Sequence, residues 1–128
     1  MYKCQQQVSE FHKAFGYPTG GTPKKATHAR RVFRARLMRE EITEFVAAKN
    51  VVDQADALAD LLYFLLGTAD EMGIDMEPVF DIVHGCNMNK LGSEGKPIYR
   101  EDGKIMKPEG WVGPEDKIKI VLENQKAI

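Results

Sequence analysis

Apolar residues recur at intervals of three and four positions through residues 3–89 of the chain. This spacing places apolar side chains on one face of an α-helix. It predicts four helices, over residues 3–15, 28–49, 52–72 and 76–89. Gly16, Asn50 and Gly73 stand where the first three helices are expected to end, and such residues commonly stop helices. The short link at Asn50 predicts an antiparallel hairpin of the second and third helices.

After Leu91 the sequence becomes rich in glycine and proline. The pair Asp102-Gly103 separates segments 97–100 and 104–107, and Asp-Gly is a strong turn signal, so a small β-hairpin is expected there. A short last helix is expected over 114–124, because its Pro-Glu-Asp start suits a helix N-terminus. The expected fold is therefore all-α, a bundle of four to five helices with a small C-terminal β-hairpin, in a single domain over residues 1–128.

Composition and charge limit the classes of partner. Hydrophobic residues make up 43% and charged residues 29%, and the formal net charge is -1. That balance argues against nucleic-acid binding by broad electrostatic attraction. The longest apolar run is too short to span a membrane, and residues 1–7 have no apolar core of the kind expected in a signal peptide. Cys4 and Cys86 have no metal-ligand spacing. We therefore expect a reduced, cytoplasmic protein with neither a nucleic-acid nor a membrane partner.

Asp60 is the main anomaly in this pattern. It is the only charged residue between Ala57 and Ala69, on a helix that is apolar on every side and so should be buried. A buried carboxylate is costly unless a positive group compensates it. Asp53 and Asp56 share its helix face; Asp53 is equally well accounted for as an acid favoured near a helix start.

A second acidic group precedes it, formed by Glu40, Glu41 and Glu44 on the neighbouring predicted helix. In an antiparallel hairpin, residues near 41–44 can lie beside residues near 56–60. Four or five carboxylate oxygens would then converge, which suits Mg²⁺ or Mn²⁺. A divalent metal in turn suggests phosphate chemistry, and the metal ligands expected are Glu41, Glu44, Asp56 and Asp60.

Two rival roles for these acidic residues stay open. A non-enzymatic helical assembly or regulatory protein would need a salt bridge to Asp60, which Arg34 or Arg36 could supply. A di-iron or di-manganese bundle usually needs Glu-x-x-His pairs, and the sequence has none. Positive and amide groups that could bind phosphate lie further along the chain. They are Asn87, Lys90, Lys96, Arg100, Lys104 and Lys107. Most lysines on a protein surface are simply solvated.

Several segments together resemble the all-α nucleoside triphosphate pyrophosphohydrolases, the superfamily of MazG-like enzymes and phosphoribosyl-ATP pyrophosphohydrolase. The matching segments are residues 11–18, 37–44, 56–63, 87–92 and 95–104. The chain departs from the family at one point. The second acidic motif usually reads Glu-x-x-Asp, and here Ala57 occupies the glutamate position. Either Asp56 replaces that glutamate, or the metal site is one ligand short.

The resemblance implies hydrolysis of a nucleoside triphosphate to the monophosphate and pyrophosphate. It implies that Glu40 or Glu41 orients or deprotonates a water, and that Asn87, Lys90 and Arg100 bind the phosphates. It also implies a homodimer or homotetramer whose helices share a core. Phosphoribosyl-ATP is the less favoured substrate because of the unusual second motif and the hairpin, and the base and sugar are not readable from the sequence.

Overall fold

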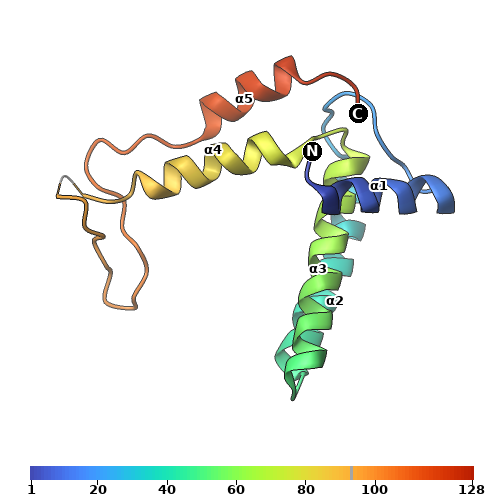
Figure 1. Ribbon diagram of the computed structural model, residues 1–128, viewed down its shortest axis with the longest axis horizontal. Coiled ribbons are helices and arrows are strands. Elements are labelled where there is room, and N and C mark those ends of the chain that lie inside the picture. Colours follow the sequence, from blue (N-terminus) through green and yellow to red (C-terminus); the bar gives the residue numbers. More distant parts are fainter. Residues whose placement is uncertain (93) are drawn as a thin grey trace. The chain divides into compact units, whose positions relative to one another are not determined.

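The computed structural model describes residues 1–92 and 94–128, which form five helices (Figure 1). The helices are α1 (Lys3–Phe15), α2 (His28–Ala47), α3 (Val51–Glu71), α4 (Met76–Met88) and α5 (Glu115–Asn124). The predicted all-α class is confirmed, and each observed helix lies within a few residues of its predicted range. None of these helices is both long and apolar enough to cross a lipid bilayer.

The chain divides into two compact units. The first comprises residues 1–76 with 125–128, and it holds α1, α2 and α3; the second comprises residues 77–124. The expectation of a single domain over residues 1–128 therefore stays a prediction.

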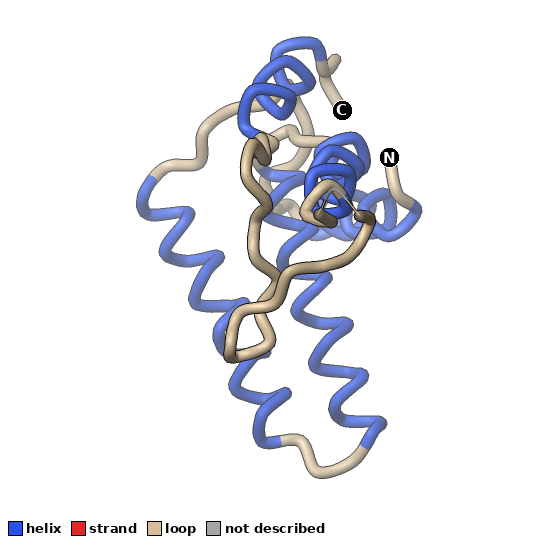
Figure 2. Tube along the Cα trace, turned by 90° about the vertical axis from the view of Figure 1, so that its left-hand side faces the viewer, coloured by secondary structure: helices blue, strands red, loops and turns tan. Residues whose placement is uncertain are grey.

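The two long helices α2 and α3 form the predicted antiparallel hairpin, joined by a short loop (Figure 2). Side chains cap both helix starts. The hydroxyl of Thr27 accepts a hydrogen bond from the Arg30 amide at 3.2 Å, and the side chain of Asn50 accepts one from the Asp53 amide at 2.8 Å. Each cap satisfies an amide that the helix leaves unpaired. The helix start of α3 therefore accounts for Asp53, as the sequence allowed.

Helix α1 packs across the end of α3 that lies away from the hairpin loop (Figure 1). Val8 is almost completely buried, and the ring of Phe11 meets the ring of Tyr63 edge-on with centroids 5.6 Å apart. Gln5 is completely buried; its amide donates to the Ile74 carbonyl at 2.7 Å and accepts from the Met76 amide at 3.0 Å. These bonds fix the turn after α3 to α1.

The predicted C-terminal β-hairpin is wrong in its extent. The chain does reverse at Gly103, but the described residues contain no strand, and pairing is limited to one antiparallel bridge between Tyr99 and Ile105. Pro97 and Pro108 lack the amide hydrogen that a longer ladder would need. An isolated exposed pair of strands also has no apolar face to stabilise it, and Tyr99 is 63% exposed.

Helix α3 presents leucines to solvent in the single chain. Leu58, Leu62 and Leu65 are each between 42% and 50% exposed. The all-round apolar character of this helix, seen in the sequence, is therefore only partly buried by α1 and α2. The predicted sharing of helices across an oligomer is not tested by one chain and stays a prediction.

Candidate active site

Three carboxylates converge on the α2–α3 hairpin. Glu41 and Glu44 come from consecutive turns of α2, and Asp60 comes from the middle of α3. Each offers an oxygen atom, and these atoms all lie within 4.8 Å of one another. Glu41 is buried, Asp60 is half-buried and Glu44 is exposed. The antiparallel hairpin therefore brings together three of the four predicted metal ligands, and we call these three residues the carboxylate cluster.

The carboxylate cluster is electrostatically strained without a cation. Burial raises the pKa of Glu41 to about 7, and a hydrogen bond with Glu44 and the charges of Glu44, Asp60 and Asp56 act in the same direction. Burial also raises the pKa of Asp60, followed by the charges of Asp56 and Glu44. One oxygen of Glu41 is buried with no hydrogen-bond partner. An orphaned buried oxygen among like charges fits a divalent cation with oxygen ligands.

Asp56 and Glu40 lie outside the carboxylate cluster, and both are exposed. Asp56 is nevertheless near enough for its charge to raise the pKa of Glu41 and of Asp60. Ala57, at the position where the related motif has glutamate, is 2% exposed. The cluster therefore lacks a carboxylate at that position, and Asp56 supplies the next nearest negative charge on α3.

The structural alternative for Asp60 required a salt bridge to Arg34 or Arg36. Arg34 instead pairs with Glu71, its Nε lying 3.1 Å from the Oε2 atom, and it donates to the Phe64 carbonyl at 2.7 Å. Arg36 lies over the ring of Phe33, 5.4 Å from the centroid. Within residues 1–92 and 94–128, neither arginine forms an ion pair with Asp60. The assignment of Asp60 to a salt bridge is therefore wrong.

Comparison with known proteins decides the family. The family model described as "Phosphoribosyl-ATP pyrophosphohydrolase" matches residues 8–87, which contain the whole α2–α3 hairpin. The chain belongs to this family. It is accordingly a pyrophosphohydrolase, and the predicted superfamily is confirmed.

A solved structure gives independent support for this family. It is described as a candidate NTP pyrophosphohydrolase from Exiguobacterium sp. 255-15, and it shares 30% sequence identity with this chain. The match covers 93% of each chain with a TM-score of 0.51. Among curated proteins, no sequence matches this pyrophosphohydrolase.

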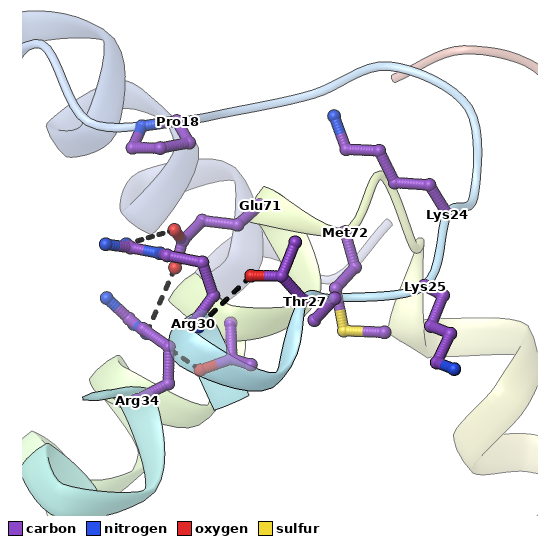
Figure 3. A pocket seen from close by; sticks show the side chains of 10 residues that line it. Pro18, Lys24, Lys25, Thr27, Arg30, Arg34, Glu71 and Met72 are labelled. Carbon is purple, nitrogen blue, oxygen red and sulfur yellow. Dashed lines mark hydrogen bonds and ion pairs between the residues drawn. The ribbon is translucent and has the colours of Figure 1, made fainter. Parts of the chain in front are cut away.

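A buried polar network that sequence reasoning missed lies at the other end of the hairpin. Asp70 is completely buried and accepts a hydrogen bond from the hydroxyl of Thr19, with His12 Nδ1 3.8 Å from its carboxylate. Beside it, Glu71 pairs with both Arg30 and Arg34 (Figure 3). These contacts join α1, the following loop, α2 and α3. They therefore hold the hairpin that carries the carboxylate cluster.

Gly67 is the sequence signal that could have revealed this network. A Cβ atom at Gly67 would lie 2.5 Å from Arg34 Nη2 and 2.8 Å from His12 Nε2. A glycine inside a helix costs stability relative to alanine, so its presence in the interior of α3 indicates a close approach of other groups. The groups that approach are the buried guanidinium and imidazole of the network.

Two cavities adjoin the network. One, of about 230 Å³, lies over the Glu71 ion pairs, with Pro18, Lys24 and Thr27 in its wall (Figure 3). The other, of about 300 Å³, is largely aromatic. Leu37 in its wall is one helical turn before Glu41, and Tyr63 is three residues after Asp60. The aromatic cavity is lined by Phe11, His12, Tyr17, Phe33, Arg34, Leu37, Tyr63 and Phe64.

The predicted phosphate-binding residues all lie in the second unit. Asn87 belongs to the last turn of α4, and Lys90 follows the end of that helix. Arg100 forms an exposed two-pronged ion pair with Asp102, which raises the pKa of the guanidinium and lowers that of the carboxylate. The roles of these residues in the pyrophosphohydrolase reaction stay predictions, as do those of Glu40 and Asp56.

Proposed function

We propose that this pyrophosphohydrolase hydrolyses a nucleoside triphosphate or deoxynucleoside triphosphate to the monophosphate and pyrophosphate, with Mg²⁺ or Mn²⁺ as cofactor. The observation that supports the proposal is the carboxylate cluster. The three acidic side chains repel one another, and the pKa of Glu41 is raised. One buried oxygen of Glu41 has no hydrogen-bond partner. Such a group of oxygen atoms suits a divalent cation. The description of the solved relative as a candidate NTP pyrophosphohydrolase agrees with this substrate class.

The residues proposed to hold the metal are Glu41, Glu44 and Asp60, with Asp56 beside them. When bound, the cation would neutralise phosphate charge and lower the pKa of a coordinated water. Either Glu40 or Glu41 is proposed to orient the attacking water and accept its proton. Burial raises the pKa of Glu41 to about 7 in the metal-free chain. A bound cation would favour the ionised carboxylate, which is the form that can accept a proton.

The two ends of the substrate have separate candidate sites. The aromatic cavity begins one helical turn from the carboxylate cluster, and its rings suit the face of a nucleobase. Asn87, Lys90 and Arg100 are proposed to contact the phosphates, where positive charge would stabilise the leaving pyrophosphate. Arg100 would have to exchange its Asp102 partner for phosphate.

We also propose that the enzyme works as a homodimer or homotetramer. The exposed leucines Leu58, Leu62 and Leu65 lie on the same helix as Asp60. Burying such a face against a second copy would remove apolar surface from water. From the sequence we also propose a cytoplasmic location.

A second candidate substrate is phosphoribosyl-ATP, because the matching family model carries that name. Both candidates release pyrophosphate, so one experiment separates them. Purified protein with Mg²⁺ is incubated with the common nucleoside and deoxynucleoside triphosphates and with phosphoribosyl-ATP, and pyrophosphate and orthophosphate are measured separately. Pyrophosphate release from at least one triphosphate, abolished by EDTA, supports the main proposal. Turnover of phosphoribosyl-ATP alone supports the second candidate, and orthophosphate release alone or no turnover contradicts both.

A further inference from the structure

The second unit contains Trp111, the only tryptophan in the sequence. Its indole Nε1 donates a hydrogen bond to the Cys86 carbonyl at 2.7 Å. Cys86 lies in the last turn of α4, where carbonyl groups lack partners within the helix. Trp111 therefore fixes the turn-rich segment after α4 to the end of that helix.

Two lysines lie over the same indole ring. Lys90 Nζ is 5.4 Å from the ring centroid and Lys107 Nζ is 4.9 Å from it. A cation is attracted to the face of an indole ring, so one ring, that of Trp111, attracts two positive charges that lie 17 positions apart in the sequence.

The lysine charges are not neutralised by carboxylates. Among the described residues, no ion pair involves Lys90 or Lys107, whereas the neighbouring Arg100 is paired with Asp102. The indole ring attracts each ammonium group but carries no net charge, so the repulsion between the two lysines persists. A ligand with several adjacent negative charges would relieve it, and a polyphosphate chain has that character.

We propose that Lys107 is a second phosphate-binding lysine and that Lys90, Lys107 and Trp111 form a clamp for the polyphosphate chain of the substrate. Trp111 is a positioning residue, because its ring places the two ammonium groups. The identity of the ligand as a triphosphate rests on the proposed function. The clamp itself rests on the contacts of Trp111 and requires no knowledge of the base.

Tripolyphosphate is the appropriate probe because it has the phosphate chain without a nucleoside. Titration into the full chain, in metal-free buffer at low salt, is followed by the fluorescence of Trp111 and independently by calorimetry. We expect saturable binding with a change in fluorescence. Lys107→Met and Lys90→Met should each raise the Kd about tenfold, in the range for the loss of one charge-assisted hydrogen bond. Lys119→Met, which removes an exposed lysine on α5, should leave the Kd unchanged.

Trp111 is tested by replacing it with leucine and measuring tripolyphosphate binding by calorimetry. If the ring positions both ammonium groups, Trp111→Leu should weaken binding at least as much as either single lysine variant. Lys107→Met should weaken tripolyphosphate binding less when it is added to Trp111→Leu than when it is made in the wild type, because without the ring Lys107 is no longer held in place. Additive effects of the two changes would contradict the positioning role.

Two results would overturn the clamp: no tripolyphosphate binding by the wild type, or an unchanged Kd in Lys107→Met. Circular dichroism and the melting temperature establish that each variant is folded. Failure of the clamp and failure of the proposed function are distinguishable. If the protein releases pyrophosphate from a nucleotide but Lys107→Met leaves the Kd of tripolyphosphate unchanged, only the clamp is rejected. Binding of tripolyphosphate that needs both lysines, with no turnover of any nucleotide, rejects only the function.

Discussion

Asp60 on α3 and Glu41 on α2 bring carboxylate oxygens within 4.8 Å of each other across the helical hairpin. Neither residue has an arginine or lysine as an ion-pair partner in the described part of the chain. Two like charges so placed repel one another and favour either protonation or a bound cation. This relationship has consequences for metal binding, pH dependence and stability.

The first prediction concerns Asp60→Asn. We expect at least a tenfold loss of Mg²⁺ or Mn²⁺ affinity, because one charged oxygen ligand is removed, while the protein stays folded. In EDTA the melting temperature should stay the same or rise, since a repelling charge is lost. Calorimetric titration and thermal melting measure the two effects. Glu10→Gln, an exposed position on α1, is the control. Unchanged metal affinity with a lower melting temperature would contradict the metal site.

The second prediction concerns Asp56, which lies outside the carboxylate cluster. Asp56→Asn should weaken metal binding less than Asp60→Asn does, because Asp56 contributes charge near the cluster without a ligand oxygen inside it. The same substitution should lower the pKa of Asp60 toward its ordinary value. Titration of the carboxyl carbons by NMR reports the pKa. A larger loss of affinity than in Asp60→Asn would show that Asp56 is a principal ligand.

The third prediction is a pH dependence of the metal-free protein. The pKa of Glu41 is raised from 4.5 to about 7 in the folded chain, so the folded state binds the proton more tightly than the unfolded state. The contribution of Glu41 to the free energy of unfolding is therefore complete below about pH 4.5 and is lost as the pH rises through about 7.

This dependence is measured from melting temperatures in EDTA between roughly pH 5 and 8, the interval in which such a group titrates. Glu41→Gln, which keeps a neutral side chain, should flatten the decline seen in the wild type. Metal binding needs the ionised carboxylate, so Mg²⁺ affinity should rise over the same interval. Parallel curves for the two proteins would exclude Glu41 as the titrating group.

The fourth prediction compares two glycines inside helices. Gly67→Ala should destabilise the protein by about 1–3 kcal/mol, because its Cβ atom would overlap Arg34 and His12. Gly85→Ala in α4 meets no atom within 4 Å and should stabilise it by about 0.5–1 kcal/mol. Chemical unfolding measures both changes. Equal effects of the two substitutions would mean that the His12–Arg34 approach at Gly67 is not close.

The fifth prediction concerns the exposed leucines of α3. Leu62 is 46% exposed in the single chain. If α3 forms the proposed interface between copies, Leu62→Asp should convert the proposed oligomer to a single chain, because it would place a charge in that interface. Light scattering after size exclusion gives the mass, to be compared with 14.4 kDa for one chain. Val112→Asp, at a 71% exposed position in the second unit, is the matched control. A wild type of single-chain mass at every concentration would reject the oligomer.

The carboxylate cluster was predictable because its determinants are local. Helical periodicity and the short link at Asn50 are both readable from the sequence, and together they place Glu41 and Glu44 beside Asp60. The four-residue spacing of Asp56 and Asp60 places both on one helix face. In the structure, however, Ala57 and Asp60 are directed further inward, and Asp56 stays outside the cluster.

The buried network around Asp70 was not predictable by the same reasoning. Its partners Thr19 and His12 lie 51 and 58 positions away, and an acidic pair at the end of a helix is usually solvated. The C-terminal turn shows another limit. Asp102-Gly103 does specify a reversal, but the length of the pairing depends on the amides that Pro97 and Pro108 lack.

The proximity of the carboxylates along the chain also bears on how the protein folds. Residues 41–60 contain every proposed metal ligand, in two helices joined by a short loop. Contacts between such near neighbours close quickly, since little loop entropy is lost. The hairpin should therefore form early in folding. A divalent cation bound to the hairpin would slow the unfolding of the hairpin more than that of the rest of the chain.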